Sequence, residues 1–345
     1  MMRFRSVASR SSARSFSTKP SLTWLDLRGS GLSILERLCL EECLWKHDQE
    51  HRNWLLIGTH EAQPHRYLEI TPPTTATTTK DWNRSTAIVL GIGGKPHELL
   101  QTDRVQSEGC LTLRRFSGGG TVVLDADSLW TTVIGRPSLG VQAFPRPIME
   151  WTAEQLYGPA FEKLGELQGQ LGGGTQRRSQ KTLILDTKSC GAVENAGRVL
   201  TLPTTTDEPT SPPPAFRLRE NDYVLGDRKM GGNAQSIGST GWLHHTSFLW
   251  DYQPENMAYL KLPSKRPKYR QDRSHEDFLV KLCEVYPQLT RRDFVASLRS
   301  VCEETFVLDV SVSLKEAQQV IEAQGGWQEW YQGHRKSRNR VVHEI

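Results

Sequence analysis

The chain has 345 residues, of which 37% are hydrophobic and 24% are charged, and its formal net charge is +4. This length suits one large domain or two ordinary ones, and the mild positive charge does not by itself indicate nucleic-acid binding. No apolar run approaches the roughly 18 residues of a membrane-spanning helix, so no such helix is predicted. The six cysteines form neither a CxxC pair nor a dense disulfide pattern, which indicates a reducing compartment.

The first twenty residues have the composition of a mitochondrial transit peptide. Residues 1–20 contain four arginines, one lysine and many serines, with no acidic residue and no apolar core of the kind that marks a secretory signal. An ordinary polar terminus is the alternative interpretation. We therefore expect location in the mitochondrial matrix, a single folded domain over residues 22–330, and a polar tail over residues 331–345.

The first predicted element is a helix over residues 34–47. Ser33 and Glu36 have the spacing of a capping box, and apolar residues follow at helical intervals. Residues 59–85 are rich in threonine and proline and contain few apolar residues, which predicts an insertion. A short buried strand is predicted at 87–94.

Consecutive strands are predicted over residues 111–135, where apolar runs flank three glycines. A helix is predicted at about 151–165. Residues 166–215 then lose all periodicity, which predicts a second insertion.

The last third of the chain contains further strands and most of the predicted helices. Residues 242–250 and 306–312 are predicted strands, and Ser274, Thr290 and Ser313 each begin a sequence typical of a capped helix start. Because no βαβ alternation is visible, we expect an α+β fold with a mixed, mostly antiparallel sheet packed with helices.

The sequence RRFSGGGTVVLD at residues 114–125 places two arginines beside three glycines between two predicted strands. Glycine amides can approach an oxyanion closely, and arginine adds fixed charge and paired donors. The pattern suits a phosphate or a carboxylate, although a hairpin turn with solvated arginines fits it equally well. It matches neither the P-loop nor the dinucleotide-binding glycine motif.

A second cationic loop occurs in RENDYVLGDRKMGGNAQSI, residues 219–237, where Lys229 stands just before two glycines. Asn221 and Asp222 would reach the same place if the flanking strands form a hairpin. A lone lysine is usually solvated, but two such loops in one sheet can form an anion cradle. Attack of a carboxylate on a nucleotide α-phosphate fits this arrangement, with Asp222 as a candidate Mg²⁺ ligand.

Two adjacent histidines, His244 and His245, lie in a predicted strand. Their rings should point to opposite faces, so they cannot bind one metal jointly. We expect one ring in the core and the other beside the cleft.

Four motifs in order resemble the lipoate-protein ligases of the biotin/lipoate ligase superfamily. They are LCLEECLWK, RRFSGGGTVVLD, NDYVLGDRKMGGNAQ and LHHTSFLWD, and the likeness spans roughly residues 24–325 with two interruptions. The segment KLPSKRPKYRQDRSHEDF at residues 261–278 resembles a short eukaryotic, mitochondrial-type branch of this family.

The resemblance implies a class II synthetase-like catalytic domain, in which lipoate and ATP, with Mg²⁺, form lipoyl-adenylate and the lipoyl group passes to a lysine of a lipoyl domain. The implied partners are the E2 subunits of 2-oxo acid dehydrogenases and the glycine cleavage H protein, with no nucleic acid and no membrane. By motif, Lys229 is the implied catalytic residue. The residues implied to line the lipoyl-adenylate pocket are Arg115, Ser117, Gly118, Gly119, Gly120, Asn221, Asp222, Gly232, Ala234 and His245.

The sequence departs from the family pattern near the implied phosphate site. Leu124 replaces a histidine, Asp127 and Ser128 replace a Gly-Asn pair, and KMGGNA replaces KxSGSA. These changes alter the donors that would surround the phosphate.

Two alternative functions stay open. An octanoyl or lipoyl transferase would use an acyl group that is already activated, but a thioester route needs a cysteine nucleophile. This chain has Pro214 at the resembling position before Lys229, and the next cysteine, Cys283, lies in a predicted helix. A non-catalytic RNA-binding protein is the second alternative, with RRFS and KYRQDR as the only basic and aromatic combinations that favour it.

Overall fold

The computed structural model describes residues 19–60, 86–126, 128–172, 212–262, 266–332 and 337–342. Most of the two predicted insertions, at 59–85 and 166–215, lies outside these residues, as does nearly all of the predicted transit peptide. Within the described residues, no helix is long and apolar enough to cross a membrane.

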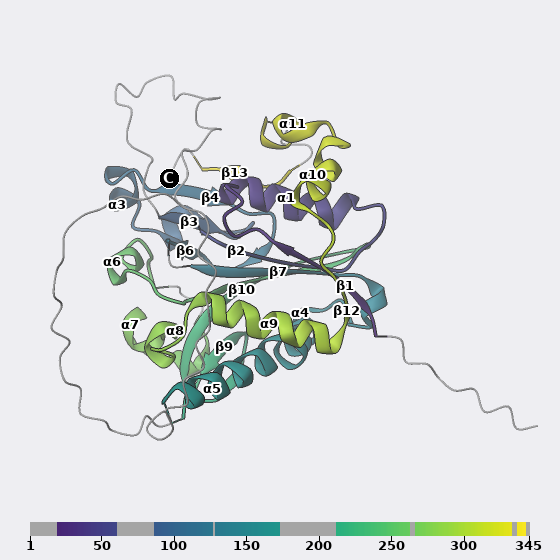
Figure 1. Cartoon of the computed structure of the whole chain (residues 1–345). Helices are drawn as coiled ribbons and strands as arrows, with labels where there is room; N and C mark the ends of the chain where they lie inside the picture. The colour runs from purple at the N-terminus through teal and green to yellow at the C-terminus, as the bar shows by residue number, and fades with distance from the viewer. Residues whose placement is uncertain are drawn as a thin grey trace, which may run out of the picture.

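The larger sheet crosses the middle of the molecule and is mixed (Figure 1). β1 pairs in parallel with β2 and β12, and the other described pairings of this sheet are antiparallel. The predicted α+β class with a mixed, mostly antiparallel sheet is confirmed, although β1, which makes the parallel pairings of this sheet, was not among the predicted strands. In spatial order the strands are β12 (Val307–Asp309), β1 (Ser21–Asp26), β2 (Trp54–Thr59), β7 (Leu129–Gly135), β11 (Gly241–Phe248), β10 (Arg228–Gly238), β9 (Asp222–Leu225) and β8 (Phe216–Arg219), with β5 (Gly118–Gly119) also paired to β10.

A smaller sheet lies beside the first and carries the sequence on both sides of the triple glycine. Its order is β13 (Arg340–Val341), β4 (Leu111–Arg114), β3 (Ala87–Leu90) and β6 (Val122–Leu124), with β3 and β4 parallel. The short helices α2 (Pro96–Leu99) and α3 (Thr102–Ser107) connect β3 to β4. The predicted run of strands over 111–135 is therefore confirmed, but it is shared between two sheets.

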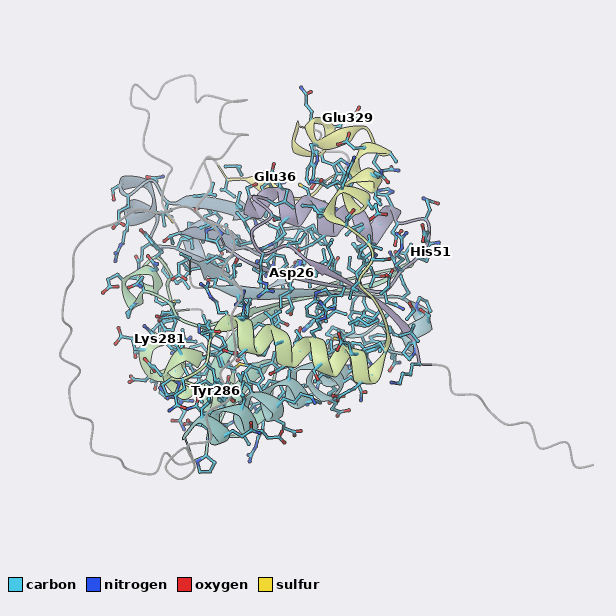
Figure 2. All side chains as sticks on the ribbon, viewed as in Figure 1. Asp26, Glu36, His51, Lys281, Tyr286 and Glu329 are labelled. Carbon is cyan, nitrogen blue, oxygen red and sulfur yellow. The ribbon has the colours of Figure 1, made fainter. Side chains whose placement is uncertain are left out.

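Helix α1 (Ile34–His47) covers one face of the larger sheet, and α10 (Leu314–Glu322) and α11 (Gly326–Gln332) pack over it (Figure 1). The capping box predicted from Ser33 and Glu36 is present and confirms the predicted helix start. Figure 2 shows Glu36 and Glu329 on this side of the molecule, and Lys281 and Tyr286 on the other.

The opposite face is covered by α4 (Pro145–Thr152), the π-helical turn Ala153–Tyr157, α5 (Gly158–Gly172) and α9 (Arg291–Thr305). The predicted helix at 151–165 is thus part of a longer helical segment, because α5 continues to Gly172. Sequence periodicity missed this last part because its polar and glycine residues are mostly exposed. The remaining short helices are Pro137–Leu139, α6 (Pro254–Met257), Lys268–Arg270, α7 (His275–Phe278) and α8 (Leu282–Val285).

Two hydrophobic cores lie on the two faces of the larger sheet. On β2, Leu55 and Ile57 belong to the core beneath α5 and α9, whereas Trp54 and Leu56 belong to the core beneath α1. Because the strand is covered on both faces, its sequence is a continuous apolar run.

The C-terminal segment is part of the folded domain. β13 pairs with β4 in antiparallel register, and Ser337 and Asn339 are buried. The boundary predicted at 330 is therefore too early, because the side chains of Ser337 and Asn339 are buried and hydrogen-bonded inside the molecule.

Candidate active site

The arginine–glycine loop, residues 114–120, is held by its own second arginine. Arg115 is 3% exposed. Its Nε donates to Ser117 Oγ at 3.0 Å, Nη1 donates to Val89 O at 3.1 Å, and Nη2 donates to Gly120 O at 2.7 Å. Burial lowers its pKa to about 10, so the guanidinium stays charged at neutral pH. Each of its three nitrogens is engaged by the protein, so Arg115 acts first as a clamp on the loop.

The glycines let this loop lie against β10. Gly118 and Gly119 pair with Gln235 and Ala234. Gly119 has φ +123°, and a Cβ there would lie 2.7 Å from Asn233 O. A larger residue at Gly119 would therefore be strained in backbone and would collide with the neighbouring strand.

A chain of hydrogen bonds joins this loop to α1. Ser117 Oγ lies 3.0 Å from His245 Nδ1, and His245 Nε2 lies 2.8 Å from Glu41 Oε2. Thr132 donates to the other Glu41 oxygen at 2.9 Å. Since the carboxylate accepts, His245 Nε2 carries a proton, and in the neutral ring Nδ1 then accepts from Ser117. Sequence reasoning missed Glu41, although its place in the predicted helix was a usable signal.

A pocket of about 50 Å³ lies between α1, this loop and the larger sheet. Of the predicted site residues, Arg115, Gly232, Ala234 and His245 line it. A Cβ on Gly232 would lie 3.1 Å from Val122 and 3.2 Å from Ser247 Oγ, so the absence of a side chain there keeps the pocket open. The other lining residues are Ile34, Arg37, Leu38, Val89, Val122, Leu124, Trp130, Thr131, Thr132, Asn233, Thr246 and Ser247.

The second cationic loop forms the predicted hairpin. β9 pairs with β10, and Lys229 Nζ lies 2.7 Å from Asp222 Oδ1. Tyr269 donates to Asp222 Oδ2 at 2.8 Å, and burial together with this carboxylate raises the pKa of the Tyr269 hydroxyl. Lys229 and Asp222 are not among the pocket-lining residues.

The predicted Mg²⁺ ligand does not fit a metal held by the protein alone. Both oxygens of Asp222 are engaged, and the described part of the chain contains no group of three His, Cys, Asp or Glu residues that could hold a metal ion. Mg²⁺ bound through a single protein carboxylate relies on substrate phosphates and water for its other ligands.

Asn221 does not line the pocket, but it is hydrogen-bonded to Asn233, which does. Its carbonyl accepts a hydrogen bond from Asn233 Nδ2 at 3.1 Å, and Asn233 lines the pocket. Asn221 therefore supports the wall of the pocket instead of forming it.

The two adjacent histidines divide as the strand geometry predicted. His244 is fully buried between Tyr223 and Gln235, each 3.1 Å from one of its ring nitrogens. Burial, with a smaller contribution from His245, lowers the pKa of His244 to about 3. His244 is thus a neutral core residue, and His245 faces the pocket.

The C-terminal segment ties the loop to α1. Asn339 Oδ1 accepts from the Phe116 amide at 2.9 Å, and its Nδ2 donates to Leu38 O at 3.1 Å and to Glu42 Oε2 at 2.9 Å. Ser337 also donates to the fully buried Glu42 at 2.9 Å. Residues 337–339 thus hold both walls of the pocket, a role that no sequence pattern indicated.

No described cysteine is placed as a nucleophile. None lines the pocket, and burial raises the pKa of Cys283 and raises that of Cys302 to about 12. Thiols with raised pKa values are poor thiolate nucleophiles at neutral pH.

Comparison with known proteins identifies the family to which this fold and pocket belong. Residues 70–303 match the model of the lipoyl protein ligase A/B catalytic domain. The match covers more than half of the chain, which therefore belongs to that family. Membership supports a ligase or transferase role in lipoate attachment.

One curated relative is the protein named inactive lipoate–protein ligase 2 of Plasmodium falciparum, which is 28% identical over 219 residues. The alignment covers 59% of this chain and 49% of the relative, so the chain spans about half the length of that protein. That relative is named as inactive, so catalysis by this chain requires its own test.

Solved structures confirm the class II synthetase-like fold of the lipoate ligases. A lipoate-protein ligase A bound with ATP superposes with a TM-score of 0.53 at 14% identity, covering 88% of this chain and 92% of that one. A Thermoplasma acidophilum protein with bound lipoic acid gives a TM-score of 0.50 at 12% identity, covering 89% and 96%. At these identities the likeness concerns the fold alone.

Proposed function

We propose that this protein is a lipoate-protein ligase of the mitochondrial matrix, which activates lipoate with ATP and transfers the lipoyl group to a lysine of a lipoyl domain. The observation that carries the proposal is the pocket between α1 and the arginine–glycine loop. Its mostly apolar wall suits an acyl chain, and Gly232 connects it along β10 to Lys229. The E2 subunits and the glycine cleavage H protein are the proposed carriers.

Lys229 would act on the carboxyl end of the chain. In this proposal its ammonium leaves Asp222 to contact the acyl carboxylate and the α-phosphate, where it stabilises the charge that develops during attack on ATP. The ion pair with Asp222 keeps the ammonium in place before substrate arrives. Mg²⁺ would enter with the nucleotide and neutralise phosphate charge.

The rival transferase would accept lipoyl-adenylate or another activated acyl group without using ATP. The raised pKa values of Cys283 and Cys302 disfavour an acyl-cysteine intermediate at either residue. Transfer directly from an adenylate to the carrier lysine remains consistent with the same pocket.

The deciding assay is acyl transfer to a purified lipoyl domain, run once from free lipoate with ATP and once from synthetic lipoyl-adenylate. We expect wild-type protein to work from both. Activity from the adenylate alone would replace the ligase with a transferase. Inactivity from both substrates would refute the proposed function.

Variants locate the chemistry within this assay. Lys229→Ala should keep the fold but lose on the order of 2 to 4 kcal/mol of transition-state stabilisation, and Lys229→Arg should not restore activity. Gly232→Ala should weaken acyl binding because its Cβ enters the pocket. Lys163→Ala is the control, since Lys163 pairs with Glu304 between α5 and α9 on the other face of the sheet. Full activity of Lys229→Ala would show that Lys229 is not part of the active site.

A further inference from the structure

Arg37 is a buried cation of the pocket with an unused donor. Its side chain is 8% exposed, and its guanidinium carbon lies 3.3 Å above the ring centroid of Trp130. Its Nε lies 3.6 Å from Glu41 Oε1, which is too long for a hydrogen bond. In the described structure Nε has no hydrogen-bond partner, and neither has Trp130 Nε1.

The other charged and titratable groups at this pocket, Arg115, His245 and Glu41, differ from Arg37 in this respect. Arg115 donates from each of its nitrogens to the loop and β3, and both nitrogens of His245 face Ser117 and Glu41. The oxygens of Glu41 already bind Thr132 and His245. A buried donor without an acceptor costs free energy, and a ligand atom that accepts would recover it.

Arg37 lies where the end of an acyl chain opposite its carboxylate would lie. Trp130 on β7 pairs with Ser247 on β11, which pairs with Gly232 on β10. One strand thus separates β7 from β10, which places Trp130 roughly 10 Å across the sheet from Gly232. A chain whose carboxylate lies toward Lys229 would extend along this row, so that its tail reaches Arg37 and Trp130.

We propose that Arg37, stacked on Trp130, contacts the end of the acyl chain and donates to it. The pocket then binds a chain that ends in sulfur acceptors more tightly than one that ends in a methyl group. The dithiolane sulfurs of lipoate are weak acceptors and pack favourably against aromatic rings. The terminal methyl of octanoate leaves the Arg37 donor unpaired. Sites built around a polar contact discriminate against analogues that lack it.

This inference rests on the proposed function for the orientation of the chain, and binding measurements separate the two. The affinities of lipoate and octanoate for the full-length protein are measured by calorimetry and by tryptophan fluorescence. We expect wild-type protein to bind lipoate on the order of tenfold more tightly than octanoate. Arg37→Met should bind the two ligands nearly equally, by losing lipoate affinity and gaining octanoate affinity.

Two further variants test the cause of this change. Arg37→Gln keeps a donor without the charge and should retain part of the preference. Arg52→Met is the matched control, because Arg52 also lies over a tryptophan, 5.4 Å from the Trp54 ring, but does not line the pocket. It should keep the wild-type ratio.

The outcomes distinguish the role of Arg37 from the proposed function. Equal affinities in wild-type protein, or an unchanged ratio in Arg37→Met, would overturn the role of Arg37 and leave the proposed function intact. Binding of neither ligand by wild-type protein would overturn both.

Discussion

Arg115 and Arg37 line the same pocket and are similarly buried, but the protein uses them differently. Burial lowers the pKa of Arg115 to about 10 and that of Arg37 to about 9. Arg115 donates from all three nitrogens to its own loop and to β3, whereas Arg37 has an Nε without an acceptor. We infer that Arg115 serves the fold, because its donors are satisfied by the protein, and that Arg37 serves a ligand of this pocket.

The largest expected effect is the loss of stability in Arg115→Met. The substitution removes the three Arg115 nitrogens that donate to Val89 O, Gly120 O and Ser117 Oγ inside the protein. We expect the free energy of unfolding to fall by about 4 kcal/mol, measured by urea denaturation. Arg115→Lys should recover little, because an ammonium cannot reach three separate acceptors. A loss below about 1 kcal/mol would contradict the clamp.

His244, like Arg115, is a buried group whose nitrogens have hydrogen-bond partners. Its effect is expected in the pH dependence of the free energy of unfolding. Its folded pKa of about 3 lies below its ordinary value of 6.5. Its contribution is therefore complete above pH 6.5 and is lost as the pH falls toward 3, because only the unfolded state takes up the proton. We expect a loss of about 2.5 kcal/mol between pH 6 and pH 4.

The measurement is urea denaturation of wild-type protein and His244→Gln across this pH range. The variant has no titrating group at this position and should lose stability less steeply. Parallel slopes for the two proteins would show that His244 is not held neutral in the fold.

A smaller loss is expected for Asn339→Ala, which removes the link between the loop and α1. The Phe116 amide would lose its acceptor, and the buried Glu42 carboxylate would lose one of its donors. We expect a loss of about 2 kcal/mol by urea denaturation, together with weaker acyl binding. Asn339→Asp should not restore it, because a second carboxylate would face Glu42. Wild-type stability in Asn339→Ala would mean that β13 alone holds this segment.

The smallest effect on stability is expected for Arg37→Met. Methionine can keep the packing on Trp130 while removing a charge whose donor is unpaired, so stability should change by less than about 1 kcal/mol. Thermal and urea denaturation beside Arg115→Met give the direct contrast. A loss as large as that of Arg115→Met would make Arg37 a second structural arginine and remove the difference between the two.

Several elements followed from local sequence alone. The capping boxes at Ser33 and Ser313 and the hairpin that brings Asp222 to Lys229 were predicted because each depends on residues that are near neighbours in the chain. The division of His244 and His245 followed from the two-residue period of a strand. The predicted insertions and the mitochondrial location stay predictions.

The sequence by itself determined the family, the class of fold and the arginine–glycine loop whose Arg115 lines the pocket, because glycine requirements, helix caps and motif order are local properties. The tertiary structure decided which polar groups are satisfied. Glu41 and Asn339 reach the arginine–glycine loop from segments far away in sequence, by contacts that no spacing rule encodes. Arg115, the arginine of the motif, donates to its own loop and to β3, whereas Arg37, outside that loop, keeps an unpaired donor. Hydrogen-bond partners in a folded chain depend on which groups are neighbours in three dimensions.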